Sequence, residues 1–284
     1  MAKHRRGHRV AATTALLHQN PGCLVTLGEL AERTGGSRSS LSEDLAVIRE
    51  VLREQDLGSV VTLPGVAGGV RFVPIPGPKT AREVIAELCR ELSDPRRLIA
   101  GGYLYMTDVV FSPQWSWRLG QVFAFLFTQP RPGGGAPPAA EADCVATVET
   151  KGIPLALMTA RCLGLPLVVA RRGLRVTEGS SVTINFVSGS TGRIQTMSLP
   201  RRALAPGARV LVVDDFMKAG STARGLEDLL AEFGARVLAT GILTATALPA
   251  EKLVGRYQAL TILQGVDERR RVVSVVPDPG LDGL

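Results

Sequence analysis

The chain has 284 residues, a hydrophobic share of 45% and a formal net charge of +7 at pH 7, which fits a globular protein of two domains with an anionic partner. No apolar run approaches the roughly 18 residues of a transmembrane helix, and the basic N-terminus is followed by a stretch too polar for a secretory signal. We therefore expect a cytoplasmic protein with no membrane partner.

The N-terminal segment combines a basic arm with helical patterns. Residues 3–9 read Lys-His-Arg-Arg-Gly-His-Arg, and a helical pattern follows over residues 10–19. Thr26 and Glu29 have the spacing of a capping box, which predicts a short second helix that stops near residues 35–36.

A third helix and a hairpin complete this module. Ser40 and Glu43 form a second capping box, and the helix it opens carries an apolar stripe of Leu41, Leu45, Ile48 and Leu52. Two helices joined by a short turn are typical of a helix-turn-helix. Two β patterns, at 59–63 and 70–73, flank a Gly/Pro turn, so the segment is predicted to be a winged helix-turn-helix domain.

Basic and hydroxyl side chains gather on this module. Ser, Thr, Arg and backbone N–H groups supply most contacts to a DNA backbone, and a Gly-rich wing can lie along it. We predict that double-stranded operator DNA is bound by Arg5, Arg6, Arg9, Arg38, Ser39, Ser40, Ser42 and Arg71. The alternative is a small helical cap domain that binds no nucleic acid.

A stiff segment, Pro74-Ile-Pro-Gly-Pro78, predicts a boundary between domains 1–74 and 75–284. A third capping box at residues 80–83 predicts a helix through Leu92, and an aromatic-rich helix is expected over 113–127. The Pro/Gly-rich stretch 129–140 is expected to be a flexible surface loop without secondary structure.

A β–α alternation follows. Strand patterns occupy residues 144–148, 166–170, 210–213, 236–247, 258–264 and 272–276. Helical patterns follow at 153–163 and 223–233, and the stretches 178–187 and 193–199 alternate as an antiparallel ribbon. Strands alternating with helices predict an α/β domain whose mostly parallel sheet is covered on both faces.

The cysteines and histidines exclude several kinds of active site. The four cysteines, Cys23, Cys89, Cys144 and Cys162, have no CxxC spacing, which indicates free thiols and argues against a structural zinc site. All three histidines lie in the first 18 residues, so the second domain lacks the imidazole of Ser-His-Asp and Cys-His catalysis. We expect no metal site in the protein.

Residues 209–222 carry the strongest chemical signal. Asp214 and Asp215 follow an apolar strand, and the small-residue loop 219–222 leads into a helix. The N–H groups of such a loop and the positive end of the helix attract a phosphate. The paired carboxylates must face hydrogen-bond donors or a metal ion, such as the hydroxyls of a sugar. The pattern predicts a nucleotide or sugar-phosphate site at the carboxyl edge of the sheet.

A second anion site is predicted one βα unit earlier. Thr150-Lys151-Gly152 follows a strand and opens a helix, with Lys151 as a point charge and Gly152 allowing close backbone approach. Arg171 and Arg172, at the end of the next strand, could reach the same anion; a solvated arginine pair is the alternative.

The stretch 209–222 resembles the PRPP-binding motif of the type I phosphoribosyltransferases, where PRPP is 5-phosphoribosyl 1-pyrophosphate. A second resemblance rests on the runs 42–45, 64–70, 101–108, 150–156, 176–180, 187–190, 193–199 and 214–220. Through these runs the chain resembles, over nearly its full length, the purine operon repressors of Gram-positive bacteria. The resemblance implies a winged-helix domain joined to a type I phosphoribosyltransferase-like domain, acting as a homodimer. It implies that PRPP is an inducer that weakens operator binding and that guanosine tetraphosphate can compete for the pocket.

The resemblance also implies residue roles. Asp214 and Asp215 would hold the ribose hydroxyls. The 5′-phosphate would be held by Lys218, Ala219, Gly220, Ser221 and Thr222, and the pyrophosphate by Thr150, Lys151 and Gly152 with Arg171. Tyr103, Phe216 and Met217 would be neighbours in the pocket. No cofactor is required, although Mg²⁺ can accompany PRPP. Ser221 replaces a usual glycine, which requires that this position keeps a negative φ.

Lys218 bears on whether the domain is an enzyme. It stands where hypoxanthine-type phosphoribosyltransferases carry an acidic general base, and a cation there favours holding an anion over removing a proton from a purine. Together with the winged helix, this predicts a non-catalytic PRPP sensor, and the resemblance implies that it represses purine biosynthesis genes. The alternatives are a catalytic purine phosphoribosyltransferase with an accessory domain, and a DNA-binding protein whose second domain only dimerises.

Overall fold

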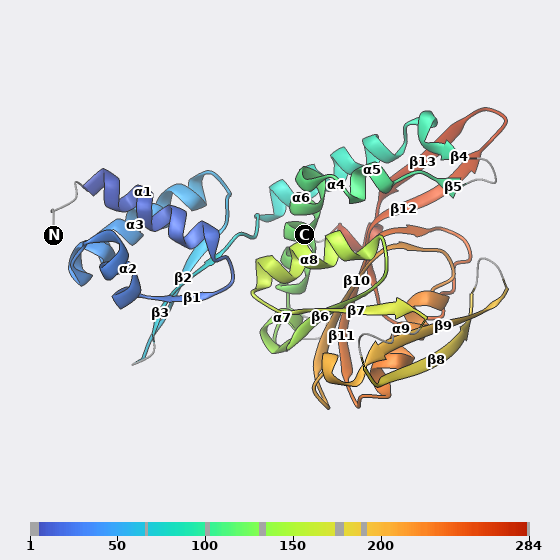
Figure 1. Cartoon of the computed structure of the whole chain (residues 1–284). Coiled ribbons are helices and arrows are strands. Elements are labelled where there is room, and N and C mark those ends of the chain that lie inside the picture. The colour runs from blue at the N-terminus through green and yellow to red at the C-terminus, as the bar shows by residue number, and fades with distance from the viewer. Residues whose placement is uncertain are drawn as a thin grey trace. The chain divides into compact units, whose positions relative to one another are not determined.

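The chain divides into two compact units, shown in Figure 1. The first comprises Met1–Thr80 with Arg161–Gly164, and the second Ala81–Ala160 with Leu165–Leu284. The computed structural model describes residues 6–65, 68–99, 103–130, 135–173, 179–188 and 192–282. Arg5, residues 66–67, and parts of the runs 101–108, 129–140, 176–180 and 187–190 therefore lie outside the described residues. The predicted boundary after residue 74 falls within the first unit.

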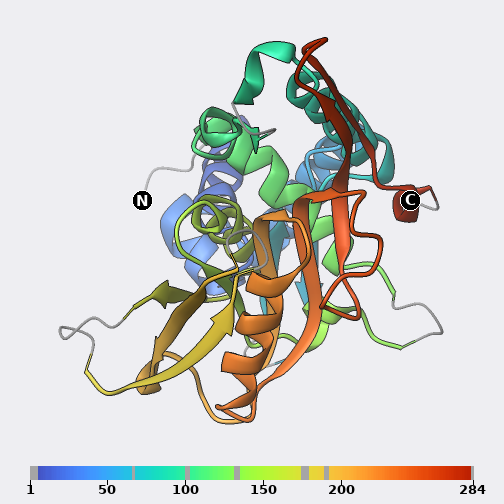
Figure 2. The same ribbon diagram turned by 90° about the vertical axis from the view of Figure 1, so that its right-hand side faces the viewer.

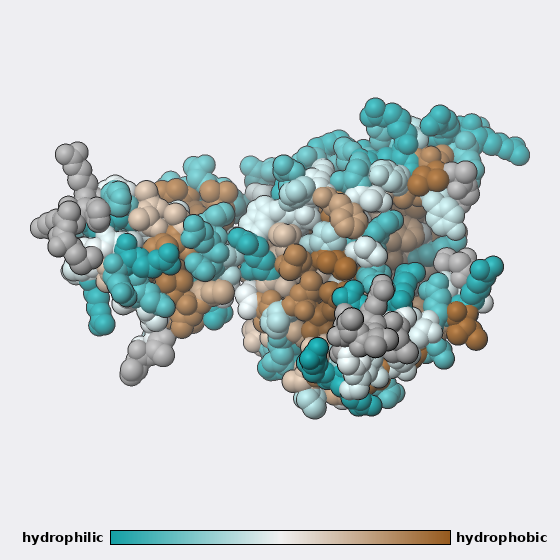
Figure 3. Space-filling model, in the orientation of Figure 1, coloured by the Kyte–Doolittle hydropathy of each residue, from teal (hydrophilic) through white to brown (hydrophobic). Residues whose placement is uncertain are grey.

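The visible surface of each unit in Figure 3 carries both hydrophilic and hydrophobic residues, and on the larger unit the hydrophobic ones gather in a patch. In the part of the chain that the structure describes, no helix has the length and apolarity needed to span a bilayer.

The first unit is a winged helix-turn-helix, as predicted. Its elements are α1 (Arg6–Gln19), β1 (Leu24–Thr26), α2 (Leu27–Thr34), α3 (Arg38–Glu54), β2 (Ser59–Leu63) and β3 (Gly69–Val73). The three strands form an antiparallel sheet in the order β1-β3-β2. The predicted stripe of α3 is buried in a core with Leu17, Leu30 and Phe72. Since α1 begins at Arg6, most of the predicted basic arm is helical.

The helix starts test the capping predictions. The Thr26–Glu29 box is present: Thr26 Oγ1 accepts from Glu29 N at 3.2 Å, and Glu29 Oε2 accepts from Thr26 N at 2.7 Å. The box predicted at Ser40 is wrong, because α3 starts three residues earlier and Ser37 caps it by accepting from Ser40 N at 3.2 Å. The next helix, α4 (Pro78–Leu92), also starts before the predicted box at Thr80, since proline suits the first turn of a helix.

The second unit opens with a mainly helical segment. It contains α4, η1 (Pro95–Arg97), β4 (Leu98–Ile99), β5 (Tyr103–Leu104), α5 (Thr107–Val110), α6 (Pro113–Phe127) and α7 (Pro138–Glu141). Helix α6 has the predicted bounds. Helix α7 overlaps the end of the stretch that was expected to lack secondary structure, so that expectation is wrong for residues 138–140.

An eight-stranded sheet follows, in the order β13-β12-β11-β10-β6-β7-β9-β8. Its strands are β6 (Cys144–Val148), β7 (Leu167–Arg172), β8 (Ser181–Val187), β9 (Ile194–Pro200), β10 (Arg209–Met217), β11 (Arg236–Thr246), β12 (Gln258–Asp267) and β13 (Val272–Pro277); its helices are α8 (Gly152–Leu163) and α9 (Ser221–Ala231). Strands β7, β6, β10, β11 and β12 are parallel. Antiparallel strands flank them on both sides, which confirms the mostly parallel sheet.

Helices cover both faces of this sheet. Helix α9, in front of the sheet in Figure 2, packs Leu226, Leu229 and Leu230 into a core with Val210 and Val212 of β10. On the other face, α6 lies so close to β11 that a Cβ atom on Gly241 would be 2.8 Å from the Phe123 ring. The predicted α/β layering is therefore confirmed.

The chain order creates a crevice in the sheet. Strand β7 adds to one side of β6, and the chain later returns to place β10 on the other side. The connections after β6 and β10 therefore run in opposite directions and leave an opening at the carboxyl ends of these two strands, where open α/β sheets bind ligands.

Candidate functional site

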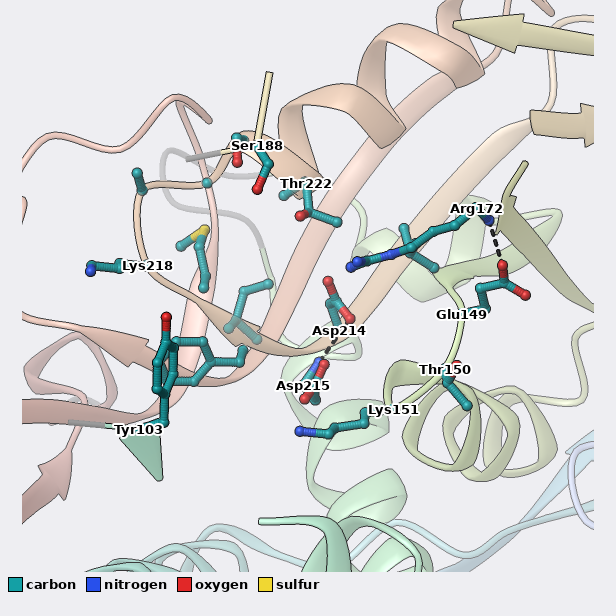
Figure 4. Close-up of a pocket in the computed structure, with 18 residues that line it drawn as sticks. Tyr103, Glu149, Thr150, Lys151, Arg172, Ser188, Asp214, Asp215, Lys218 and Thr222 are labelled. Atoms are coloured by element: carbon teal, nitrogen blue, oxygen red, sulfur yellow. Dashed lines mark hydrogen bonds between the residues drawn. The ribbon is translucent and has the colours of Figure 1, made fainter. Parts of the chain in front are cut away.

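A pocket of about 460 Å³ lies at this switch point (Figure 4). It is lined by β5, by the ends of β6, β7 and β8, by β11, and by the end of β10 with the loop that leads into α9. The polar lining residues include Glu149, Thr150, Lys151, Arg172, Ser188, Asp214, Asp215, Lys218, Ser221 and Thr222. The fold thus brings together the predicted acidic pair, the predicted phosphate loop and Lys151, with Tyr103, Phe216 and Met217 beside them.

The acidic pair belongs to the sheet itself. Strand β10 runs to Met217, beyond the predicted end at Val213, because its pairing with β11 continues through Met217 and Ala245. The Asp214 carboxylate is buried, with 7% of the residue exposed, and its Oδ1 accepts from Asp215 N at 2.9 Å.

The electrostatics of the pair favour a ligand rich in hydrogen-bond donors. Burial raises the pKa of Asp214 well above its ordinary value, and the neighbouring Asp215 charge raises it further. Burial also raises the pKa of Asp215, against the opposing effect of Lys151. In Figure 4, Lys151 lies beside Asp215, and the side chain of Arg172 reaches toward Asp214. Buried carboxylates are costly unless donors or cations satisfy them, so sugar hydroxyls or a metal ion would stabilise this pair.

The phosphate loop ends in an open helix start. Gly220 is the N-cap of α9 in a left-handed conformation, with φ 85°, and as a glycine it supplies no side-chain cap to this helix end. The first N–H groups of α9 and its positive dipole end are therefore directed at the pocket that Ser221 and Thr222 line. Ser221 is the first residue of α9 and does not have a positive φ. The requirement for a negative φ at this position is therefore met.

Gly152 is needed for packing against the acidic strand. A Cβ atom at this position would lie 2.1 Å from Thr147 Oγ1 and 2.8 Å from Asp214 Oδ1. The sequence indicated one reason for glycine here, which is close approach of the backbone to a ligand. The structure adds a second, because a larger residue would clash with Thr147 and Asp214. Thr150 and Lys151 stand exposed just before it, at the mouth of the pocket.

The two arginines at the end of β7 have different environments. Arg172 lines the pocket, whereas Arg171, the residue chosen from the sequence, is not among the lining residues and pairs with Glu149 at 3.5 Å between Nη1 and Oε2. Glu149 also accepts from Arg172 N at 2.5 Å. Sequence reasoning missed Glu149 and Ser188; each directly follows a strand that ends at the site, which was the available signal.

The first unit has a groove of about 540 Å³ between α3 and the β2–β3 hairpin. Arg38 and Ser42, both predicted to contact DNA, line it and are exposed. Ser39 is exposed and Ser40 half-buried, and the hydroxyls of both lie within 3.0 Å of Ser37 Oγ. This face presents cationic and hydroxyl groups suited to a phosphate backbone.

Arg49 is a groove residue that the sequence analysis did not select. Its Nε donates to Val60 O at 2.9 Å, and its Nη2 donates to Thr62 Oγ1 at 2.5 Å. These two bonds connect α3 to the first strand of the hairpin, so they fix where the hairpin lies relative to the helix.

Three of the predicted DNA-binding arginines lie outside the groove lining. Arg9 is largely buried and pairs with Asp44, while the exposed Arg6 reaches the same carboxylate at 3.5 Å. Arg71 lies on the central strand β3, where its Nε is buried and has no hydrogen-bond partner among the described residues. Arg9 therefore has an ion-pair partner inside the unit, and part of the Arg71 guanidinium is buried in it. Contacts of these two side chains to DNA stay a prediction.

Comparison with known proteins finds a family match in each of the two units. Residues 5–74 match the family model described as bacterial purine repressor, N-terminal, and residues 139–268 match the phosphoribosyl transferase domain. The purine biosynthesis transcriptional repressor PurR of Bacillus subtilis is 40% identical over 273 residues, covering 96% of this chain and 92% of the relative. The purine biosynthesis transcriptional activator PurR of Lactococcus lactis is 33% identical over 271 residues, covering 95% and 96%.

A solved structure supports the fold of the second unit. The adenine phosphoribosyltransferase of Saccharomyces cerevisiae superimposes with a TM-score of 0.51 at 18% identity, covering 62% of this chain and 98% of that chain. At this identity the likeness concerns the fold alone.

Proposed function

The chain belongs to the family of bacterial purine biosynthesis transcriptional regulators, and we propose that it is a DNA-binding repressor of purine biosynthesis genes whose second unit senses PRPP. The family and the two-domain α/β architecture expected from the sequence are confirmed. The repressor assignment follows the relative with 40% identity, which is named a repressor.

The observation that supports PRPP is the placement of two carboxylates between two anion sites. Asp214 and Asp215 offer acceptors for adjacent ribose hydroxyls. On one side lies the open start of α9 with residues 218–222, which suits a 5′-phosphate; on the other lie Lys151 and Arg172, which suit a pyrophosphate. PRPP carries these three groups in this order, and Mg²⁺ bound to its pyrophosphate would add a cation for the carboxylates.

A sensing role fits the lining better than catalysis does. The carboxylates among the described lining residues are Glu149, Asp214 and Asp215. Glu149 is engaged by Arg171 and by the Arg172 N–H, and the aspartates are assigned to the ribose. Lys218 occupies the position where an acidic general base would be expected, and Figure 4 places it across the pocket from Arg172. An exposed cation there also provides a contact for the competing anion guanosine tetraphosphate.

The two units would communicate by linkage. PRPP can release operator DNA only if it binds the DNA-free state more tightly than the DNA-bound state. The groove between α3 and the hairpin is the proposed DNA-contacting face, used twice in a homodimer.

Calorimetry and filter binding test this proposal. Wild-type protein should bind PRPP with Mg²⁺, and Asp214→Ala/Asp215→Ala should not; Asp228→Ala, which removes an exposed carboxylate of α9, is the matched control. PRPP should weaken the binding of DNA from upstream of purine biosynthesis genes in the wild type but not in the double variant. Turnover of a purine base with PRPP at an enzymatic rate, or an operator affinity that PRPP leaves unchanged, would contradict the proposal.

A further inference from the structure

The segment that follows β11 lies against the outer side of the phosphate loop. Lys252 Nζ donates to Lys218 O at 2.6 Å and to Thr246 O at 2.7 Å, and lies 3.4 Å from Thr246 Oγ1. Next to it, Leu253 N donates to Ala219 O at 2.9 Å. Hydrogen bonds thus connect the backbone of the phosphate loop to a segment 34 positions further along the chain.

These bonds determine which way the loop's peptide groups face. In a planar trans peptide, the carbonyl of one residue and the N–H of the next point in opposite directions. The carbonyls of Lys218 and Ala219 are turned toward Lys252 and Leu253. The N–H groups of Ala219 and Gly220 consequently face away from this segment, toward the pocket that both residues line.

The surroundings of Lys252 are unusual for a lysine. An ammonium group has three N–H donors and no acceptor, and here three oxygen acceptors surround it. All three are uncharged, so the positive charge is hydrogen-bonded but is not neutralised by a carboxylate in the bonds described. Burial lowers the pKa of Lys252, which reflects the cost of placing this charge behind the loop. A bound phosphate on the other side of the loop would offset that cost.

We propose that Lys252 is a positioning residue for the 5′-phosphate subsite. It holds the carbonyls of the phosphate loop outward, so that the loop N–H groups point at the phosphate before the ligand arrives, and it adds a positive charge behind them. The inference rests on the proposed PRPP function and extends it to a residue that does not line the pocket.

Two partial ligands separate this subsite from the rest of the pocket. Ribose 5-phosphate has the phosphate that the loop would hold, whereas inorganic pyrophosphate would occupy the region of Lys151 and Arg172. Lys252→Met keeps the length of the side chain and removes its charge and donors. It should weaken the binding of ribose 5-phosphate and of PRPP about tenfold or more, and leave the affinity for pyrophosphate within about twofold of wild type.

Three further variants test why Lys252→Met should lose affinity for ribose 5-phosphate, and one of them is a control. Lys252→Arg keeps the charge but replaces a compact three-donor group by a planar fork, so an intermediate loss is expected. Thr246→Val removes a hydroxyl that lies near Lys252 Nζ and itself donates to Lys218 O at 3.2 Å, so it should weaken ribose 5-phosphate binding to a smaller extent. Lys79→Met, at an exposed position of α4, is the matched control and should bind all three ligands as the wild type does. Thermal melts followed by tryptophan fluorescence check folding, because Trp115 and Trp117 both lie in the second unit.

The outcomes are distinct. Wild-type affinity of Lys252→Met for ribose 5-phosphate would overturn the inference, and so would equal losses for ribose 5-phosphate and pyrophosphate. If Lys252→Met does not fold, Lys252→Arg and Thr246→Val carry the same comparison. A wild-type protein that binds no PRPP would overturn the proposed function itself, whatever the variants do.

Discussion

Arg9 donates its Nε–H to the Oδ2 atom of Asp44 at 2.9 Å, and this carboxylate is completely buried within the winged-helix unit. The pair joins α1 to α3, the helix that carries Arg38 and Ser42. Removing one partner of a buried ion pair leaves an uncompensated charge inside the protein. Arg9 therefore stabilises the DNA-binding unit whether or not it also contacts DNA.

We predict that Arg9→Ala destabilises this unit by about 3 kcal/mol. Hydrogen exchange measured by mass spectrometry on the full chain should show amides of α1 and α3 exchanging about 100-fold faster, while the second unit is unaffected. Arg6→Ala is the control: Arg6 lies 3.5 Å from the same carboxylate but is 60% exposed, so its loss should cost about 0–1 kcal/mol. If both variants lost the same stability, the buried Arg9–Asp44 bond would contribute no more to stability than the exposed Arg6–Asp44 contact.

A second prediction concerns the stability of the empty pocket. Burial raises the pKa of both Asp214 and Asp215, so the folded state holds these protons more tightly than the unfolded state does. The stabilising contribution of the protonated forms is present at low pH and is lost as the pH rises through the raised pKa values.

Asp214→Asn should therefore stabilise the ligand-free second unit at neutral pH, by about 1 kcal/mol or roughly 2–4 °C in Tm, and its Tm should change less with pH than that of the wild type. Tryptophan fluorescence reports this unit. The same variant should fail to respond to PRPP, since the amide adds donors where the ribose needs acceptors. A variant less stable than wild type at neutral pH would refute the argument.

Ligand binding should show the opposite dependence on pH. Protonated carboxylates are poor partners for Mg²⁺ and accept weaker hydrogen bonds from hydroxyls. PRPP affinity should thus fall as the pH is lowered through the raised pKa values. Pyrophosphate alone, titrated over the same range, controls for protonation of the ligand's own phosphates, and an identical pH profile for the two ligands would exclude a role for the aspartates.

The sequence predicted well those features whose cause lies within a few neighbouring residues. The Thr26–Glu29 cap formed as expected, and α6 begins at Pro113 after Ser112, which accepts from Trp115 N. The start of α3 was mispredicted because Ser37 and Ser40 are both suitable caps, and local spacing does not decide between them. In the structure the earlier cap is used: Ser37 Oγ accepts from Ser40 N, and Leu41 N donates to Ser37 O at 2.9 Å.

Features fixed by distant parts of the chain could not be predicted in the same way. The length of β10 depends on its pairing with β11, which no local pattern reveals. The choice between Arg171 and Arg172 depends on which side chain of β7 faces the pocket, and this is visible only in the folded chain, where Arg172 lines the pocket. Lys252 lies in a segment without a recognisable motif, and its contact with the phosphate loop follows only from the folded chain.

Gly152 provides a further test of the pocket. Gly152→Ala would place a methyl group against Thr147 Oγ1 and Asp214 Oδ1, which requires α8 or the acidic strand to move. We expect a loss of about 1–3 kcal/mol in stability and a large loss of PRPP binding. Gly255→Ala is the control, because a Cβ atom there meets nothing within 4 Å. Normal PRPP binding by Gly152→Ala would show that the contact relaxes without disturbing the site.

The last prediction concerns Arg49, whose bonds to Val60 and Thr62 hold the hairpin against α3. Arg49→Ala removes both the tie and a positive charge from the groove, and should weaken operator binding about tenfold or more. Arg49→Lys keeps the charge but cannot reproduce two bonds from a planar fork. If the two hydrogen bonds to the hairpin are the main contribution of Arg49 to operator binding, the lysine variant should lose nearly as much affinity as the alanine variant.

A salt titration of operator binding separates the two contributions. The slope of log affinity against log salt should fall by about one in Arg49→Ala if this arginine also meets a DNA phosphate, and should stay unchanged in Arg49→Lys. Arg53→Ala, which removes an exposed arginine from the next turn of α3 but lies outside the groove lining, is the control. Wild-type affinity in Arg49→Lys would show that charge alone matters at this position, whereas wild-type affinity in Arg49→Ala would exclude this part of the groove from operator binding.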